Sequence, residues 1–257
     1  LDRDIIEKAG GHHGSGCSLR FQDLGPIAAR MRAVKDPDEL AALKRAAHIV
    51  DIGIAAAASA IAPGVTERRI AAAAEQAMLA AGADSVPFNA VLAGANSALP
   101  HGRTSDYAMC DGDMVICDIG ATYRGYNGDI TRTFAVGKPK PEMARIYEVV
   151  YDANRAACRA ARPGITGEQL DSVARDVITG AGFGEYFTHR TGHGLGLEIH
   201  EEPYVVQGAK KPLEAGMVFT IEPGIYIPGV GGVRIEDDLA LTDDGCLVLT
   251  AFPRELA

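Results

Sequence analysis

The dominant hydrophobic pattern of the chain is an apolar, β-branched run that two aspartates interrupt. The run extends from Val115 to Phe134 and places Asp118 and Asp129 eleven residues apart, with a turn rich in Gly and Asn between them. Apolar runs joined by such a turn predict a β-hairpin. Two carboxylates that face each other in a buried sheet are poorly solvated, so they need protons, cationic side chains or metal ions. The hairpin therefore predicts a positively charged partner.

Helical periodicity dominates the residues before this hairpin. A first helix is predicted to begin at Pro37, with Asp36 as its N-cap, and to stop before Pro63. A second helix is capped by Thr66 and ends at Gly82.

The same order of elements recurs after the hairpin. Residues 140–182 repeat the helix, the Pro-Gly step, the Thr-capped helix and the final Gly, and residues 216–222 match residues 112–118. A period this long predicts a duplicated α+β unit, because solenoid repeats have only about 20–50 residues. Pseudo-twofold packing of two such units would bring Asp118 near Glu222. It would also bring Asp129 near Glu236, in a second hairpin.

Composition and charge narrow the range of partners. The 257 residues are 47% hydrophobic, which allows a sizeable core in one large domain or two small ones. The formal net charge of -9 argues against nucleic acid or an anionic membrane, since both require concentrated Lys and Arg. The apolar stretch 49–62 is shorter than the roughly 20 residues that span a bilayer. A metal ion is a better match as the partner.

The five cysteines are scattered and form no CxxC pair. This usage predicts reduced thiols and a cytoplasmic location. Each cysteine is expected to be a small buried residue, with oxidation of Cys117, beside Asp118, as the alternative.

A glycine-rich segment at 188–205 carries His189, His193 and His200. A phosphate-binding loop is the rival interpretation, but the segment has no GxGxxG or GK[ST] pattern. One histidine with four carboxylates suits manganese, cobalt, zinc or iron, and differs from a thiolate zinc site. Two divalent ions would neutralise four carboxylates, whereas one ion would leave two buried charges. Two ions about 3.5–4 Å apart can activate water at neutral pH for attack on a carbonyl.

Taken together, these motifs resemble those of the pita-bread metallopeptidases. The similarity rests on DIG, GDITRTF, TGHGLG, TIEPGIY and GVRIEDD and covers about residues 32–257. It implies an α+β fold in which a duplicated unit forms a curved antiparallel sheet flanked by helices. Creatinase and the histone-chaperone relatives share the fold without the full ligand set, so a chain that retains the set is expected to be an enzyme.

The resemblance gives each matched position a role in holding metal. Asp118 would chelate one ion, and His193 and Glu222 would chelate the other. Asp129 and Glu236 would bridge both ions. Manganese or cobalt is the expected metal, with zinc or iron as alternatives.

Catalytic roles follow from the same resemblance. Glu222 would take the proton of the attacking water. His101 and His200 would donate hydrogen bonds or protons to the scissile carbonyl and the tetrahedral intermediate. A purely structural role stays open for both histidines.

Three further positions are expected to bind substrate. His189 would border the pocket for proline, and Arg234 would orient a ligand carboxylate, with the substrate's terminus as a second candidate. Tyr226 is the third position. A supporting role stays open for all three residues.

Two branches of this family compete for the function. The length suits a methionine aminopeptidase, but PFNAVLAGANSALPHG and IEPGIYIPGVGGVRIEDD favour the proline-specific branch. We therefore expect an Xaa-Pro dipeptidase or aminopeptidase that acts on small peptides with proline at the second position. The alternatives are methionine aminopeptidase-like activity and a non-catalytic peptide-binding module. The resemblance leaves a homodimer open.

The ends of the chain suggest a domain division. Residues 1–31 show no regular pattern and are expected to be a tail or the remnant of an N-terminal domain or linker. His12 and His13, which glycines flank, are expected to lie in a solvated turn rather than to bind metal. Residues 32–257 would form the catalytic domain, with repeats at about 36–137 and 138–250.

Overall fold

The computed structural model describes residues 23–256, so the turn expected at His12 and His13 lies outside the described range. The helices are α2 (Gly25–Ala33), α3 (Pro37–Ala60), α4 (Glu67–Ala80), η1 (Gly94–Ala98), α5 (Pro141–Ala160), α6 (Gly167–Gly180) and η2 (Gly184–Tyr186). The strands are β1 (Asn89–Ala93), β2 (Met114–Tyr123), β3 (Tyr126–Ala135), β4 (Gly192–Gly194), β5 (Glu201–Val205), β6 (Val218–Ile221), β7 (Gly224–Ile227), β8 (Gly231–Arg234), β9 (Asp237–Leu241) and β10 (Cys246–Val248).

Helices α3 and α4 begin where the sequence predicts. The Asp36 side chain accepts hydrogen bonds from the backbone N–H groups of Asp38 and Glu39. The Glu39 carboxylate in turn accepts from the Asp36 N–H, which completes a capping box. The Thr66 hydroxyl accepts from the Arg69 N–H at the start of α4. Both predicted N-caps are confirmed.

The second helix pair repeats these local features. Thr166 caps α6 as Thr66 caps α4. Gly64 and Gly164, two residues before the caps, have φ values of 81° and 88°, a conformation that Gly adopts without strain. The two halves therefore share a local design, while the proposed repeat boundaries stay a prediction.

The predicted hairpin is present as β2 and β3. Its turn residues Arg124 and Gly125 have φ values of 51° and 81°, as a two-residue type I′ turn requires. Asp118 pairs with Thr131, and Asp129 pairs with Gly120. The two aspartates are therefore diagonal neighbours on one face of the hairpin rather than a directly opposed pair.

The hairpin expected in the second half is broken at both carboxylates. Glu222 and Pro223 separate β6 from β7, and Ile235 and Glu236 separate β8 from β9. Pro223 has no N–H and cannot continue a ladder. At the second break, the Glu236 N–H donates to the Thr131 carbonyl of β3 at 3.0 Å. The breaks thus place both carboxylates where the two halves meet.

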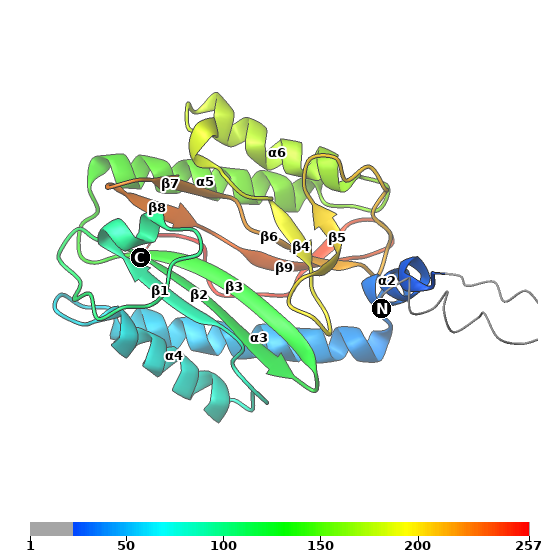
Figure 1. Cartoon of the computed structure of the whole chain (residues 1–257), viewed down its shortest axis with the longest axis horizontal. Coiled ribbons are helices and arrows are strands. Elements are labelled where there is room, and N and C mark those ends of the chain that lie inside the picture. The colour runs from blue at the N-terminus through cyan, green and yellow to red at the C-terminus, as the bar shows by residue number, and fades with distance from the viewer. Residues whose placement is uncertain (1–22, 257) are drawn as a thin grey trace, which may run out of the picture.

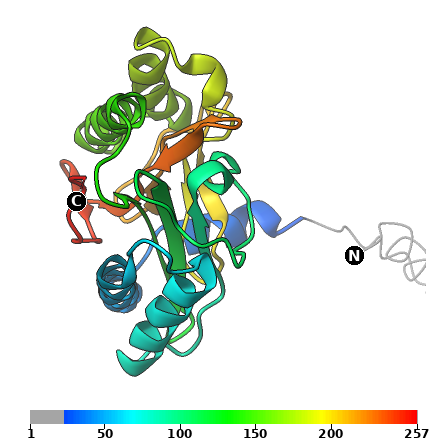
Figure 2. The ribbon, with the colours of Figure 1, turned by 90° about the vertical axis from the view of Figure 1, so that its left-hand side faces the viewer.

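The strands lie between two helix pairs. Figure 1 shows α3 and α4 on one side of the strands and α5 and α6 on the other, and Figure 2 shows this arrangement after a quarter turn. One hydrophobic cluster, which includes Ile54 and Ile119, joins α3 and α4 to β1, β2 and β3. Another, which includes Ile146 and Phe219, joins α5 and α6 to the second-half strands. Each half therefore has its own core.

Helix α2 occupies a segment that the sequence indicated to be irregular. Only Ala33 of this helix is buried, so the segment has no strong apolar periodicity to reveal it. Its Arg30 and Arg32 side chains pair with Glu214 and Glu198 at 3.0 and 2.9 Å. These partners are distant in sequence, and local pattern could not have identified them.

The expectation that every cysteine is buried is wrong. Cys117 and Cys158 are buried, but Cys110 is exposed and Cys246 is partly buried. Cys17 lies outside the described residues. Burial raises the pKa of the Cys117 thiol far above its usual range, which disfavours the reactive thiolate. The alternative that Cys117 is sensitive to oxidation is therefore not supported.

Across residues 23–256, no helix combines the length and apolar character needed to cross a membrane.

Candidate metal centre

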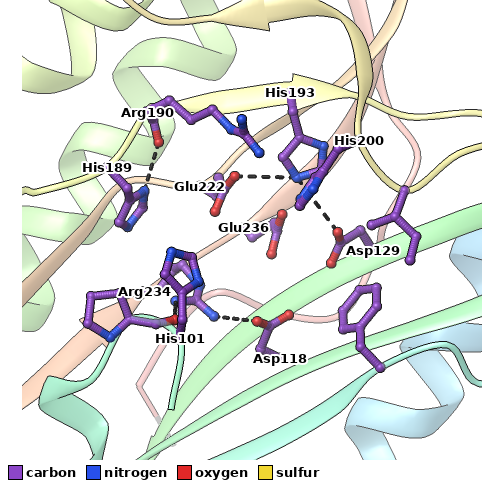
Figure 3. Close-up of a pocket in the computed structure, with 13 residues that line it drawn as sticks. His101, Asp118, Asp129, His189, Arg190, His193, His200, Glu222, Arg234 and Glu236 are labelled. Carbon is purple, nitrogen blue, oxygen red and sulfur yellow. Dashed lines mark hydrogen bonds and ion pairs between the residues drawn. The ribbon is translucent and has the colours of Figure 1, made fainter. Parts of the chain in front are cut away.

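A cavity of about 550 Å³ opens between the β2–β3 hairpin and the second half of the chain (Figure 3). It is lined by Phe88, Pro100, His101, Asp118, Asp129, His189, Arg190, His193, Ile199, His200, Glu222, Arg234 and Glu236. The lining includes all five expected metal ligands and both expected catalytic histidines. It also includes Arg190, to which the sequence analysis gave no role although it lies between His189 and the TGHGLG motif.

Three side chains form a compact buried group in this cavity. Asp129 comes from β3, His193 comes from β4, and Glu236 lies at the break between β8 and β9. One ligand atom of each lies within 4.8 Å of the others, which is close enough to share a metal ion. The expected approach of Asp129 to Glu236 is thus present.

The other two expected ligands lie at the edge of this group. Glu222 Oε1 is 3.4 Å from His193 Nε2, on the side of the imidazole away from its backbone. Asp118 Oδ2 instead forms an ion pair with Arg234 Nη2 at 2.5 Å. Asp118 therefore shares the cavity with the group, but its carboxylate is directed to a cation of the protein.

The group has the properties of a cation site. The Asp129 Oδ1 atom is buried and has no hydrogen-bond partner among the described residues. Burial, followed by repulsion from Glu236, raises the pKa of Asp129 well above its usual range. The pKa of Glu236 is also raised well above its usual range, first by burial and then by repulsion from Glu222. Clustered carboxylates of this kind are stabilised by a divalent cation, so these residues fit a metal ion.

The histidine of the group has the protonation state of a ligand. Burial, and then the neighbouring His200, lowers the pKa of His193 to about 3. The imidazole is therefore neutral at physiological pH, which is the form that binds metal. Its Nδ1 lies 3.2 Å from the Gly194 carbonyl, which leaves Nε2 directed toward Asp129 and Glu222.

Tyr226 supports the cavity wall from behind. It is 4% exposed, and its hydroxyl accepts a hydrogen bond from Arg234 Nη1 at 2.8 Å. The same hydroxyl lies 2.9 Å from His189 Nε2, while His189 Nδ1 lies 2.8 Å from the Arg190 carbonyl. Burial lowers the pKa of His189 to about 4, so the ring is neutral and Tyr226 donates to Nε2. Direct contact of Tyr226 with substrate stays a prediction.

His101 and His200 approach the cavity from different loops. The His200 ring lies 4.1 Å from the His193 ring in an edge-to-face arrangement. Burial lowers the pKa of His200, which favours its neutral form. Figure 3 shows His101 near Arg234 and Asp118, apart from His200. His101 and His200 thus border the cavity at two separate positions.

A buried ion pair fixes the loop that ends at His200. Glu201 accepts hydrogen bonds from Lys35 Nζ at 2.8 Å and from Arg32 Nη2 at 2.7 Å. The side chains of Lys35 and Glu201 are 1% and 7% exposed. On the other side of the loop, the Asn127 side chain donates to the Gly196 carbonyl at 3.0 Å.

Two residues that the sequence analysis did not single out orient the ligands. Thr131 Oγ1 donates to Glu236 at 2.6 Å and accepts from Arg234 Nε at 3.1 Å. Asp238 Oδ2 accepts from the Asp129 N–H at 3.0 Å. Thr131 lies two positions after Asp129, so the period of a strand places it on the same face. That period, applied to GDITRTF, was the available signal for Thr131.

Curated proteins similar to this chain include peptidases. The Xaa-Pro dipeptidase of Pyrococcus horikoshii is 46% identical over 237 residues, which cover 92% of this chain and 68% of that protein. The probable dipeptidase PepE of Mycobacterium tuberculosis is 46% identical over 231 residues, which cover 90% of this chain and 62% of that protein. This chain thus spans about two thirds of each relative.

Solved structures show the same fold. The prolidase from Pyrococcus furiosus superposes with a TM-score of 0.92 at 42% identity, over 99% of this chain and 74% of that one. The X-Pro aminopeptidase from Thermotoga maritima gives a TM-score of 0.90 at 39% identity, over 100% of this chain and 72% of that one. The expected pita-bread fold of α+β class is therefore confirmed. The sequence profile of metallopeptidase family M24 matches residues 41–243, and the chain belongs to this family.

Proposed function

We propose that this chain is a metal-dependent peptidase that hydrolyses the bond before proline in Xaa-Pro dipeptides. The observation that carries the proposal is the buried group of Asp129, His193 and Glu236 in a cavity of about 550 Å³. Relatives at 45–46% identity that bear the name Xaa-Pro dipeptidase support the choice of substrate.

Five side chains would hold two divalent ions. Asp129 and Glu236 would bridge the ions, His193 and Glu222 would complete one ligand set, and Asp118 would complete the other. A set rich in carboxylates suits manganese or cobalt, with zinc or iron as alternatives. When bound, such ions would polarise the scissile carbonyl and make a water molecule acidic enough to attack it.

The protein side chains supply the remaining steps. Glu222 lines the same cavity as the expected ligands and would accept the proton of the attacking water and pass it to the proline nitrogen. His101 and His200 would donate hydrogen bonds to the carbonyl oxygen as negative charge develops on it. Phe88, His189 and Ile199 line the same cavity and would exclude water from the proline ring.

A peptide panel tests this proposal. Chelator-treated protein would be resupplied with Mn²⁺ or Co²⁺ and given Ala-Pro, Ala-Pro-Ala and Met-Ala-Ala, with the released amino acids quantified. We expect proline from Ala-Pro only when metal is present. Methionine release without any cleavage before proline would instead identify a methionine aminopeptidase. A failure to cleave any peptide, with peptide binding unchanged in Asp129→Ala, would favour a binding module.

A further inference from the structure

Arg190 occupies the cavity wall next to the candidate metal ligands. It lies between His189 and strand β4, and its side chain is half-buried. Figure 3 shows this side chain extending along the cavity toward His193 and Glu222. Its charge lowers the pKa of Glu222, and it also lowers the pKa of His193. Arg190 therefore acts electrostatically on the space in which substrate would lie.

The guanidinium groups of Arg190 and Arg234 differ in the partners that they have within residues 23–256. Arg234 donates to Asp118, Tyr226, Thr131 and the Pro100 carbonyl, so four of its N–H groups are in use. The Arg190 guanidinium has no hydrogen-bond or ion-pair partner among residues 23–256. It lies 5.1 Å from the centre of the Tyr204 ring, which supports it without using any N–H group.

The C-terminal carboxylate of a dipeptide substrate is an anionic group that can pair with the Arg190 guanidinium. An Xaa-Pro dipeptide has a free carboxylate on the proline, one residue beyond the scissile carbonyl, whereas a longer peptide has a neutral amide there. A guanidinium binds a carboxylate through two parallel N–H groups, and its planar shape fixes the orientation. In the proposed enzyme the two metal ions would neutralise the ligand carboxylates, which leaves the charge of Arg190 available.

We propose that Arg190 binds the C-terminal carboxylate of the substrate and so selects dipeptides over longer peptides. This inference rests on the proposed function. It assigns to Arg190 the role that the sequence analysis offered to Arg234, whose guanidinium is held by Asp118 at 2.5 Å. Arg190 is then a specificity-determining residue, and Arg234 orients a metal ligand.

The test compares ligands that differ only in their C-terminal charge. The dissociation constants of L-proline and L-prolinamide would be measured by calorimetry with the manganese-loaded wild type, Arg190→Gln and Arg190→Lys. Wild type should bind proline at least tenfold more tightly than prolinamide. Arg190→Gln should bind proline and prolinamide equally, and its affinity for prolinamide should stay within about twofold of the wild-type value. Arg190→Lys, which keeps the positive charge, should retain part of the preference for proline.

Kinetics with Ala-Pro provide a second measurement. Arg190→Gln should raise KM about tenfold or more and change kcat by less than about threefold, since the carboxylate is bound equally before and during the reaction. Arg155→Gln is the matched control, because Arg155 lies 5.2 Å over the Tyr151 ring on the exposed side of α5. Its substitution should change neither parameter.

The outcomes separate this inference from the proposed function. Wild type that fails to release proline from Ala-Pro would contradict the proposed function. Cleavage of Ala-Pro together with an unchanged proline preference in Arg190→Gln would overturn the assignment of Arg190. The assignment would also be overturned if wild type showed no preference for proline, or if Arg190→Gln lowered kcat and left KM unchanged.

Discussion

The two aspartates of the hairpin, Asp118 and Asp129, differ in exposure and in the partners of their carboxylates, although both interrupt the same apolar run of the sequence. The Asp129 side chain is 5% exposed, and its Oδ1 has no hydrogen-bond partner within the part of the chain that the structure describes. The Asp118 side chain is 24% exposed and is neutralised by Arg234. Removal of Asp129 would open a gap at the centre of the ligand group. Asp129 is therefore the less replaceable of the two residues.

Glu222 should make the metal-free protein less stable as pH rises. Burial raises the pKa of Glu222 to about 7, whereas a glutamate in an unfolded chain titrates near about 4.3. Between these values the folded state retains a proton that the unfolded state has lost, so rising pH favours unfolding. We expect this group to lower the free energy of unfolding by about 1–3 kcal/mol between about pH 5 and pH 7.5. Urea denaturation with a chelator present measures this change.

The Glu222→Gln variant isolates the effect of this titration. Glutamine has nearly the same shape and does not ionise, so the variant should lose less stability over the same pH range. Equal pH dependence in both proteins would show that Glu222 titrates with an ordinary pKa.

At the residue scale, the sequence predicted which side chains line the cavity but not which of them form ion pairs with one another. The motifs placed Asp118 and Arg234 in one cavity, because each stands at a fixed offset from a recognisable ligand. Their ion pair joins residues that are 116 positions apart and depends on side-chain rotamers. Local patterns contain no such information, so this pairing required the structure.

At the scale of elements, a buried carboxylate on α4 fixes the loop that carries His101. Glu67 is fully buried and accepts hydrogen bonds from the backbone N–H groups of Ala93 and Ser105, both at 2.7 Å. It also accepts from the Asn96 side chain at 3.0 Å and the Ser105 hydroxyl at 2.7 Å. The loop from β1 to His101 is thereby attached to the start of a helix.

Removing this carboxylate should destabilise the protein and misplace His101. Glu67→Ala leaves the N–H groups of Ala93 and Ser105 without a partner, which costs about 2–4 kcal/mol of unfolding free energy. The kcat for Ala-Pro should fall as well, because His101 loses its fixed position. Urea denaturation and steady-state kinetics measure the two effects. Glu75→Ala, at an exposed position of the same helix, should change stability by less than about 0.5 kcal/mol.

A Glu67→Ala variant with the stability and kcat of the wild type would show that the loop is held by other contacts.

The sequence predicted the starts of helices α3 and α4 but not the strand breaks of the second half or helix α2. The caps of α3 and α4 are local hydrogen-bond patterns, and the sequence alone identified Asp36 and Thr66. The break between β6 and β7 also has a local cause, since Pro223 cannot continue a strand ladder. The match of residues 216–222 to residues 112–118 nevertheless predicted a second hairpin without that break. Helix α2 could not be identified, because its side chains are mostly exposed and show little periodicity.

At the scale of the whole molecule, an ion network behind the ligands ties the two halves together. Arg132, from β3, donates to Asp237 at 2.8 Å and to the Phe252 carbonyl at 2.7 Å. Arg254 donates to the other oxygen of Asp237 at 2.6 Å. Asp51, in α3, accepts from the Phe252 N–H at 2.9 Å. The segment near residue 252 thus connects helix α3 to strand β3, which carries Asp129, and to Asp237, which directly follows Glu236.

Several expectations about the whole protein stay predictions. These are the homodimer, the cytoplasmic location and the assignment of residues 1–31 to a tail or to the remnant of an N-terminal domain or linker. The chain spans 68% of the Pyrococcus horikoshii Xaa-Pro dipeptidase.

The number of divalent ions per chain tests the central claim most directly, because ligands from both halves must cooperate to hold two. Protein would be equilibrated with Mn²⁺, freed of unbound ion by gel filtration and subjected to elemental analysis. We expect two ions per chain in the wild type and fewer than one in Asp129→Ala, because Asp129 would bridge both. One ion or none in the wild type, or two in Asp129→Ala, would contradict the account.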